Sequence, residues 1–186
     1  MVRSRTVHRG AGREVLRRCP GDRLVDRSVS TARRPPDLRH LIQVPKFLGH
    51  RPSLVHRVHG TTPWGHPVAY ALTDDRWTLL VFLSTSCDGC QELWDAFGAP
   101  ESSPLPRDLM TVVVTRGPAL EVPDNVARLS GGASVVMSDD AWSDYGVHAG
   151  PFFVLVDGMA AQVASEGVAW SLEQITGAIA AARGDE

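Results

Sequence analysis

The sequence has no long apolar run, and this absence limits where the protein can reside. The longest apolar runs, among them residues 79–83, have the length of a buried strand, whereas a membrane-spanning helix needs about 20 apolar residues. The N-terminus also lacks the apolar stretch of a signal peptide. The chain as written is therefore expected to be cytoplasmic, with no visible membrane tether. An incomplete or misassigned N-terminus would instead allow an extracytoplasmic location.

Cysteine is scarce as well, and its spacing matters more than its number. Three cysteines in 186 residues exclude a small secreted scaffold that depends on several disulfides. Cys87 and Cys90 are separated by two residues, and such a C-x-x-C pair is more often redox-active or metal-binding than structural. Cys19 has no other cysteine near it in the sequence, so we expect it to be a free thiol.

Lysine is nearly absent, since Lys46 is the only one and the other basic residues are arginines. Residues 1–39 contain eleven arginines but only four acidic residues, so the rest of the chain is acidic. Apolar residues are sparse and aperiodic in this region, which predicts a disordered Arg-rich arm over residues 1–45. Such an arm could bind nucleic acid or anionic lipid. The lack of lysine and of interleaved aromatic residues favours a solvated tail with no nucleic-acid partner.

Beyond the arm, the pattern of apolar residues predicts one folded domain over residues 46–186. Short apolar and β-branched runs predict strands, and apolar residues spaced three and four apart predict helices. This order predicts an α/β fold of three layers, in which parallel central strands and a closing antiparallel hairpin share one mixed sheet. The expected strands are 54–59, 68–72, 77–83, 110–115, 134–137, 152–156 and 162–166; the expected helices are 87–97, 139–145 and 171–182; and a loop or a helix lies between 115 and 134.

The C-x-x-C pair occupies a position that suits redox chemistry. Cys87 follows the expected buried strand and a short polar turn, which places it at or near the start of a helix. Free N–H groups and the helix dipole stabilise an anion there, and such surroundings lower a cysteine pKa from about 8.5 to between roughly 3.5 and 7.5. Cys90 lies one turn later, within disulfide reach but more shielded. The pattern therefore predicts that Cys87 attacks a substrate disulfide and that Cys90 resolves the mixed disulfide.

Metal binding and a purely structural role are the alternatives for this pair. A C-x-x-C pair can supply two of the four ligands of a zinc ion. His56 and His59 have H-x-x-H spacing, with His50 and His66 nearby. Structural zinc pairs usually lie on knuckle turns rather than directly after a buried strand. The sequence therefore favours redox chemistry with neither a metal nor another cofactor.

Residues 78–90 contain an apolar strand, a polar loop and the C-x-x-C pair, and residues 146–158 contain a Gly-Pro loop that enters an apolar strand. These two segments resemble the C-x-x-C segment and the cis-proline signature of the thioredoxin-like superfamily, in particular of thiol–disulfide oxidoreductases of the membrane-associated, cytochrome-maturation and methylamine-utilisation types. The resemblance covers roughly residues 47–186. It implies a thioredoxin-like three-layer α/β/α sandwich with a mixed sheet, preceded by the basic arm.

The resemblance also implies a binding site and partners. Pro151 would be the cis-proline that packs beside Cys87 and shapes a groove for substrate backbone, and Gly150 would offer its backbone groups to the substrate. The expected substrate is a protein or small-molecule disulfide, and an upstream electron donor would restore the dithiol. His148, close to Pro151 in the sequence, could stabilise a thiolate or move a proton, or could be a solvent-facing loop residue.

Several positions depart from the thioredoxin pattern around the cysteines. Val81 stands where thioredoxins carry a buried acid, and Ser86 stands where an aromatic residue is usual. Asp88, an auxiliary candidate, lies between the cysteines, where its charge should oppose ionisation of Cys87. Asp95 replaces the proline that kinks the helix. These differences affect the expected redox potential more than the expected fold.

The sequence favours a thiol–disulfide oxidoreductase that reduces protein disulfides, and it leaves two other functions open. Peroxiredoxins share the fold and carry threonine or serine three residues before the reactive cysteine. Ser84 meets that spacing, but Leu80 replaces the proline of their motif. The other alternative is a non-catalytic module that binds a partner in the groove and uses its thiols as a redox sensor.

Overall fold

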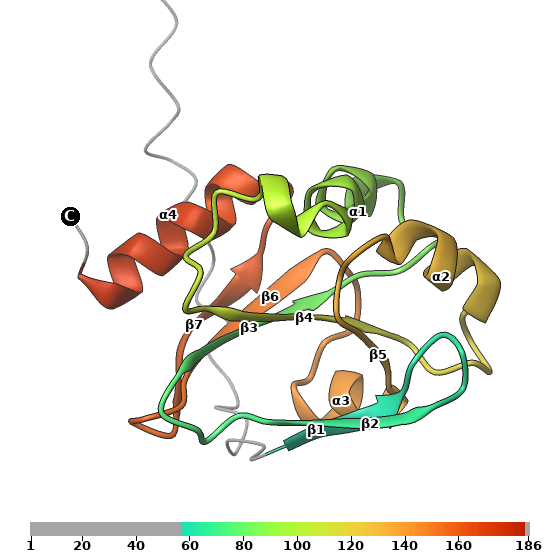
Figure 1. Ribbon diagram of the computed structural model, residues 1–186, viewed down its shortest axis with the longest axis horizontal. Helices are drawn as coiled ribbons and strands as arrows, with labels where there is room; N and C mark the ends of the chain where they lie inside the picture. The colour runs from blue at the N-terminus through green and yellow to red at the C-terminus, as the bar shows by residue number, and fades with distance from the viewer. Residues whose placement is uncertain (1–56, 185–186) are drawn as a thin grey trace, which may run out of the picture. The chain divides into compact units, whose positions relative to one another are not determined.

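The computed structural model describes residues 57–184 of the chain. The arm expected over residues 1–45, with Cys19, lies outside this part, so the division into 1–45 and 46–186 stays a prediction. Figure 1 shows how the described elements are arranged. In chain order they are β1 (Arg57–Thr61), β2 (Pro67–Ala71), β3 (Trp77–Phe82), the 3-10 turn η2 (Asp88–Cys90), α1 (Gln91–Gly98), the 3-10 turn η3 (Pro100–Ser102), β4 (Met110–Thr115), α2 (Pro123–Ser130), β5 (Val135–Met137), α3 (Asp139–Asp144), β6 (Phe152–Asp157), β7 (Gln162–Val168) and α4 (Leu172–Arg183).

One mixed sheet contains all seven of these strands, in the order β2-β1-β5-β4-β3-β6-β7. β3, β4 and β5 are parallel, and the strands on either side run antiparallel to their neighbours. β3 is central because its side chains are apolar on both faces, and residues 79–82 are completely buried. The mixed sheet with a closing hairpin, predicted from the order of the elements, is therefore confirmed.

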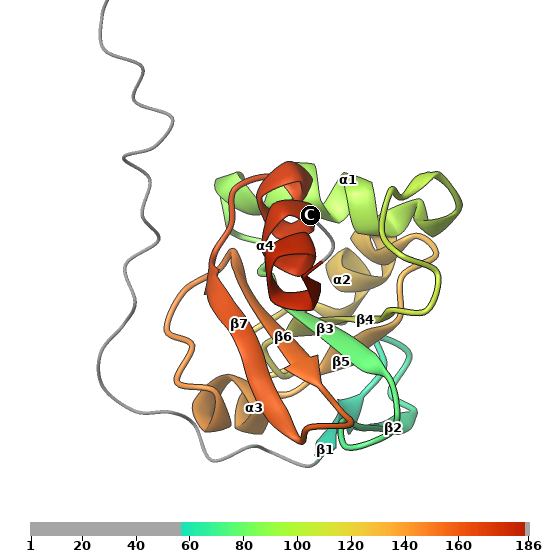
Figure 2. The ribbon, with the colours of Figure 1, turned by 90° about the vertical axis from the view of Figure 1, so that its left-hand side faces the viewer.

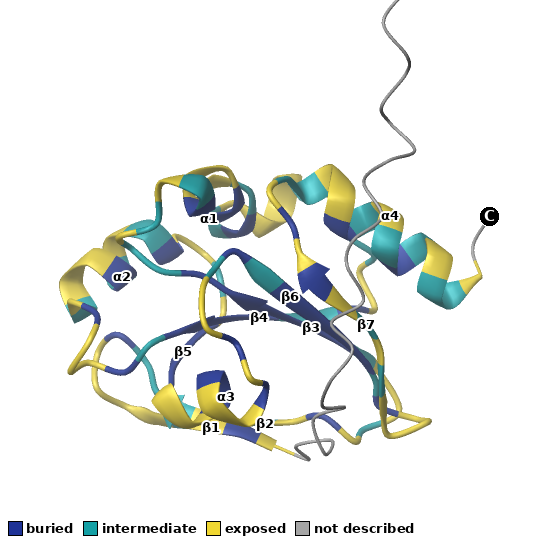
Figure 3. Ribbon diagram, turned by 180° about the vertical axis from the view of Figure 1, so that it is seen from behind, coloured by how far each residue is buried: buried dark blue, intermediate teal, exposed yellow. Residues whose placement is uncertain are grey.

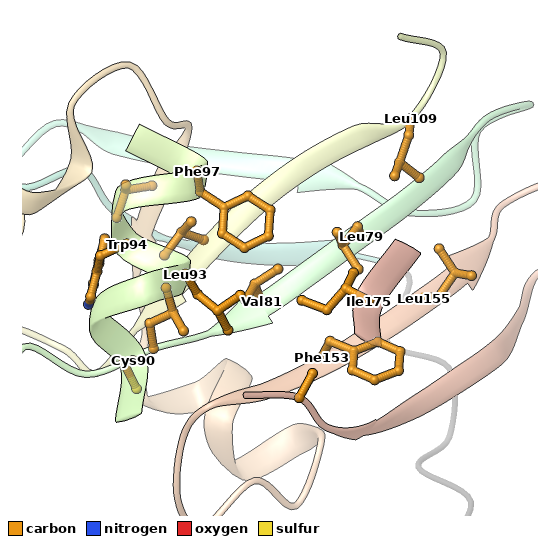
Figure 4. Close-up of a cluster of buried hydrophobic side chains, with 14 of the residues drawn as sticks. Leu79, Val81, Cys90, Leu93, Trp94, Phe97, Leu109, Phe153, Leu155 and Ile175 are labelled. Carbon is orange, nitrogen blue, oxygen red and sulfur yellow. The ribbon is translucent and has the colours of Figure 1, made fainter. Parts of the chain in front are cut away.

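Helices cover both faces of the sheet and divide the core in two. α1, α2 and α4 lie over one face, and α3 lies over the other (Figures 1 and 2). Leu79 and Val81 point into the core under the three helices (Figure 4), whereas Leu80 and Phe82 pack with Trp142 of α3 on the opposite face. Figure 3 shows the buried residues along the central strands and on the inward sides of the helices. The predicted three-layer α/β/α sandwich is confirmed.

The first turn of the expected helix 87–97 differs from the prediction. Asp88–Cys90 is a 3-10 turn, and the α-helix spans Gln91–Gly98. Asp88 and Gly89 are both poor helix formers, and the buried face of α1 begins only at Leu93. The low helix propensity of Asp88 and Gly89 therefore accounts for the 3-10 geometry of this turn. The α-helix begins only where the chain packs against the sheet.

The connection between β4 and β5, which the sequence left as a loop or a helix, contains α2. This helix begins with Pro123, whose fixed φ and missing N–H suit the first position of a helix. Val126 and Ser130 form its buried side. The segment is short and weakly apolar, so its periodicity alone could not distinguish a helix from a loop.

The hairpin of β6 and β7 turns over residues 158–161. Asp157 Oδ1 accepts a hydrogen bond from Ala160 N at 3.0 Å, and Ala161 N donates to Gly158 O at 3.3 Å. An aspartate side chain that accepts a hydrogen bond from a backbone N–H three residues later stabilises a longer turn than the two-residue Asp-Gly type.

Serine side chains cap the N-termini of two helices. Ser138 Oγ accepts a hydrogen bond from Ala141 N at 3.1 Å, and Ser171 Oγ accepts one from Gln174 N at 3.4 Å. Ser171 and Gln174 have the spacing of a capping box, but the Gln174 side chain accepts from Trp170 N at 2.7 Å and not from the N–H of Ser171.

None of the helices within residues 57–184 has the length and apolar character needed to cross a membrane.

Candidate functional site

The two cysteines lie on the turn that follows β3, which we call the cysteine turn (residues 84–90). Cys87 N donates a hydrogen bond to Ser84 O at 3.4 Å, and Cys90 N donates to Cys87 O at 3.0 Å. Trp94 Nε1, from the buried face of α1, donates to Ser84 O at 3.3 Å. These bonds fold the polar segment after β3 back on itself and hold it against the first turn of α1.

Cys87 and Cys90 are joined by a disulfide, and their Cα atoms are 5.4 Å apart. Cys90 is 0% exposed and belongs to the core that also contains Leu93 and Trp94 (Figure 4). Cys87 is half-buried at the edge of the same core. The pair therefore consists of one partly exposed cysteine and one that the protein shields completely.

The electrostatic surroundings of Cys87 are less favourable to an anion than the sequence predicts. α1 begins at Gln91, so the first free amides after Cys87 belong to the 3-10 turn and not to an α-helix. These amides still favour an anion, although so short a turn has a small dipole. The exposed carboxylate of Asp88 lies next to Cys87 in the chain, and its charge opposes a thiolate, with screening by solvent.

The loop before β6 packs directly on the cysteine pair. The carbonyl oxygen of Gly150 lies 3.6 Å from Cys87 Sγ, and a Cβ atom on Gly150 would lie 3.4 Å from Cys90 Sγ. The Gly150–Pro151 peptide bond is cis, which is the isomer that the resemblance implied, and Pro151 is buried. The loop reaches the cysteines because β6 pairs antiparallel with β3, with Phe152 opposite the last residue of that strand.

The auxiliary candidates are not joined to the cysteines. His148 and Asp88 are both exposed, and within residues 57–184 no hydrogen bond or ion pair connects either of them to Cys87 or Cys90. The Ser84 hydroxyl, which matched the peroxiredoxin spacing, lies 3.0 Å from Ser86 Oγ and accepts from Ser86 N at 3.3 Å. Its contacts are thus within the cysteine turn itself.

The structure brings to the cysteine turn an acid that sequence reasoning missed. Glu121 is buried, and its carboxylate accepts hydrogen bonds from the backbone N–H and the hydroxyl of Thr85, two residues before Cys87. Glu121 and Thr85 are 36 positions apart, and Glu121 lies in a segment with no recognisable motif. The only local signal is an acid between two aliphatic residues, which is too common to identify a site.

Trp170 is a second residue beside the cysteine turn that the sequence analysis did not identify. Its indole ring lies against Gly89, so closely that a Cβ atom on Gly89 would lie 2.8 Å from Trp170 Cε3. Trp170 remains 57% exposed. It lies between β7 and α4, and it therefore forms an apolar rim beside the residues that separate the two cysteines.

The histidines considered as zinc ligands lie elsewhere or outside the described part. His59 is on β1, where its Nε2 atom is 3.7 Å from Asp140 Oδ2, and His66 is in the turn that follows. His50 and His56 fall outside the described residues. Within residues 57–184, no three or more His, Cys, Asp or Glu side chains are grouped so that they could hold a metal ion.

Comparisons with known proteins show similarity in structure. No protein-family model and no curated protein matches the sequence. Among solved structures, the chain resembles a secreted Mycobacterium tuberculosis disulfide oxidoreductase homologous to DsbE of E. coli, with 19% identity, a TM-score of 0.51, and coverage of 67% of this chain and 95% of that one. It resembles DsbF of the same organism, with 17% identity, a TM-score of 0.52, and coverage of 70% and 98%.

A third similar structure is a thiol:disulfide interchange protein of the thioredoxin family from Chlorobium tepidum TLS. The identity is 20%, the TM-score is 0.52, and the match covers 72% of this chain and 98% of that one. The structural similarity is consistent with the order of the strands in the sheet. The described residues also contain a C-x-x-C pair and a cis-proline at one end of the sheet. Residues 57–184 therefore have the thioredoxin-like fold.

Proposed function

We propose that the protein is a thiol–disulfide oxidoreductase that reduces disulfides of protein substrates with Cys87 and Cys90. One observation carries this proposal: the two sulfurs are joined at the turn that leads into α1, with Cys87 half-buried, Cys90 fully buried and Gly150 packed against both. A disulfide between residues three apart closes a loop too short to stabilise the fold much by restricting the unfolded chain. Redox exchange is therefore the better explanation for this pair.

The reaction begins from the dithiol form, in which Cys87 is the nucleophile. Its thiolate attacks one sulfur of the substrate disulfide, the substrate S–S bond breaks, and a mixed disulfide with Cys87 forms. The displaced substrate sulfur leaves as a thiolate and takes up a proton. Cys90 cannot take this role, because its sulfur is buried and a protein disulfide could not approach it.

Cys90 completes the exchange. After losing its proton it attacks Cys87 Sγ, the mixed disulfide breaks, and the second substrate sulfur leaves as a thiolate. Two electrons have then passed from the dithiol to the substrate, and the protein holds the Cys87–Cys90 disulfide. A thiol electron donor must reduce this bond before the next turnover, and dithiothreitol can fill that role in an assay.

Gly150 and Pro151 are proposed to bind the substrate backbone beside Cys87. Gly150 is half-buried and its carbonyl group lies at the sulfur, so its backbone is well placed to contact an extended segment that carries a disulfide. Pro151 is buried and has no N–H, so it can shape the groove without competing for the hydrogen bonds of the substrate.

Insulin reduction tests the proposal. With dithiothreitol as electron donor, the full chain should accelerate precipitation of the insulin B chain, and Cys87→Ser should abolish the acceleration. Cys90→Ser should retain the attacking thiol and accumulate a mixed disulfide with insulin, detectable by mass spectrometry. Cys19→Ser is the matched control and should behave as the wild type.

Failure of the wild type to exceed the Cys87→Ser control would end the proposal. Consumption of hydrogen peroxide by the reduced protein would then support the peroxidase alternative. A protein inactive in both assays would support the non-catalytic module, in which the thiols respond to oxidation without turnover.

A further inference from the structure

Residues 120–122 invert the usual relation between polarity and burial. The apolar side chains of Leu120 and Val122 are 68% and 57% exposed, whereas Glu121 between them is 6% exposed. Glu121 is the only acidic residue that is buried within residues 57–184. Burying a carboxylate is unfavourable unless hydrogen bonds replace those lost to water. The position of Glu121 therefore requires a compensating partner.

Thr85 of the cysteine turn is that partner. Thr85 N donates to both oxygens of the Glu121 carboxylate, at 3.2 and 3.4 Å, and the Thr85 hydroxyl donates to Oε2. The ion pairs among residues 57–184 do not include Glu121. Hydrogen bonds from one residue, two positions before Cys87, thus compensate for the buried charge. Bonds to a charged acceptor are stronger than those to a neutral one.

The loop that carries Glu121 is itself anchored to the rest of the domain. Glu121 N donates to Gly117 O at 3.0 Å, and Gly117 N donates to Asp139 Oδ1 at 3.0 Å, at the first residue of α3. This loop follows β4, the parallel neighbour of β3, so it leaves the sheet at the same edge as the cysteine turn. The Glu121 carboxylate therefore joins a fixed loop to the cysteine turn, which is otherwise held at its ends, by the Trp94 hydrogen bond, and by the contacts of Gly150 with Cys87 and of Trp170 with Gly89.

We propose that Glu121 is a positioning residue for Cys87, acting through Thr85 to fix the cysteine turn. The inference rests on the proposed function, in which Cys87 is the nucleophile, and adds the residue that holds it in place. A fixed turn keeps each thiol at a high effective concentration relative to the other, which favours the disulfide over the dithiol. Loosening the turn should make the Cys87–Cys90 bond easier to reduce.

Two variants at Glu121 separate the hydrogen bonds from the charge. Glu121→Gln removes the charge but keeps an oxygen that can accept from Thr85 N and an amide that can donate to the Thr85 hydroxyl. Glu121→Ala removes the charge and both contacts. Because the two variants are equally uncharged, any difference between them reports the lost side-chain contacts, including the hydrogen bonds to Thr85, and not the lost charge. Asp124→Asn, an exposed acid at the start of α2, is the matched control.

Two measurements on the full chain read out the position of the turn. Hydrogen exchange of the Thr85 amide should be about tenfold faster in Glu121→Ala than in the wild type, because local opening no longer breaks a hydrogen bond. The equilibrium constant for reduction of Cys87–Cys90 by dithiothreitol should rise roughly threefold to tenfold in the same variant. Glu121→Gln should lie close to the wild type in both measurements, and Asp124→Asn should match it.

Indistinguishable behaviour of Glu121→Gln and Glu121→Ala would overturn the proposal, as would an unchanged Thr85 exchange rate in Glu121→Ala. If Glu121→Ala does not fold, Thr85→Val removes the hydroxyl bond from the other side, and Thr85→Ser restores it. Thr85→Val should then raise the equilibrium constant for reduction of Cys87–Cys90, and Thr85→Ser should leave it unchanged. Equal equilibrium constants for these two variants would again overturn the proposal.

Neither measurement requires a substrate, so the two proposals can fail separately. A wild type that reduces no insulin, together with a clear difference between the Gln and Ala variants, would reject the proposed function and retain the role of Glu121. A wild type that reduces insulin, together with identical behaviour of Glu121→Gln and Glu121→Ala, would retain the proposed function and reject the role of Glu121.

Discussion

The carbonyl oxygen of Gly150 lies 3.6 Å from Cys87 Sγ, although the two residues are 63 positions apart in the sequence. Antiparallel pairing of β6 with β3 brings the loop before one strand to the turn after the other. The loop that carries Gly150 is therefore packed directly on the cysteine pair.

Gly150→Ala should destabilise the oxidised protein. The added Cβ atom would lie 2.8 Å from the Phe82 carbonyl oxygen, which is fixed in β3, and 3.4 Å from Cys90 Sγ. Because backbone atoms cannot easily move away, we expect the free energy of unfolding to fall by about 1–3 kcal/mol, as for other overpacked sites. Guanidinium unfolding of the oxidised form measures this change.

Gly177→Ala is the control for that substitution. Gly177 lies inside α4, and a Cβ atom there would meet nothing within 4 Å. Alanine should stabilise this helix, by about 0.8–1.0 kcal/mol at an exposed site. Equal effects of the two substitutions on the free energy of unfolding would contradict the close packing of Gly150.

Gly89→Ala should displace the Trp170 ring without unfolding the protein. The new Cβ atom would overlap the ring, but Trp170 is more than half exposed and its side chain can rotate away. We expect the free energy of unfolding to change by no more than about 0.5 kcal/mol. The tryptophan emission spectrum should change, because the ring leaves its contact with the cysteine turn.

The Trp170→Phe background identifies the source of that spectral change. There, Gly89→Ala should leave the emission spectrum unaltered, since the other tryptophans do not contact Gly89 in the space that the added atom occupies. A change of the same size in both backgrounds would show that Trp170 is not the residue affected.

Asp108→Asn should lower the free energy of unfolding at neutral pH and have a smaller effect on it in acid. Arg183 Nη1 lies 3.2 Å from Asp108 Oδ2, and its hydrogen bond holds the pKa of Asp108 below the usual value. A carboxyl group whose folded pKa is lowered contributes stability above its unfolded pKa of about 3.9 and loses it as the pH falls through the folded pKa. Denaturant unfolding at neutral pH and in acid, each at low and high salt, measures this dependence.

Glu166→Gln should change the free energy of unfolding at neutral pH in the direction opposite to Asp108→Asn. Partial desolvation by its neighbours raises the pKa of Glu166, so the ionised form of this surface residue is disfavoured in the folded state. The stability that this group contributes is complete below its unfolded pKa and is lost as the pH rises through the folded pKa. Glutamine should therefore raise the free energy of unfolding at neutral pH and lose this advantage in acid. If the two variants shared the same pH trend, the assigned causes would be wrong.

The strands and the position of the cysteines were predictable because they depend on local patterns. A continuous apolar run predicts a strand buried on both faces, and β3 is that strand. The C-x-x-C that follows it must then lie at the end of the sheet. The exact start of α1 was missed because the apolar spacing that predicts a helix begins only at Leu93, after the Asp88–Gly89 pair.

The contacts around the cysteines were predictable only where a family signature existed. The resemblance brought Gly150 and Pro151 to the site, but it contained nothing for Glu121 or Trp170. Both come from loops whose own sequences have no motif, and their partners are far away in the chain. Such contacts depend on which loops leave the sheet at the same edge, and that is decided by the order of the strands.

Hydrophobic periodicity and residue spacing act locally, so the alternation of strands and helices and the place of the C-x-x-C pair after a central strand can be predicted from the chain alone. The hydrogen bonds of a buried carboxylate to the cysteine turn, and the indole ring beside that turn, depend on the assembled fold. Those contacts form when β4, β3, β6 and β7 assemble into one sheet and bring their connecting loops together. No local pattern in the chain predicts which of these loops will be neighbours.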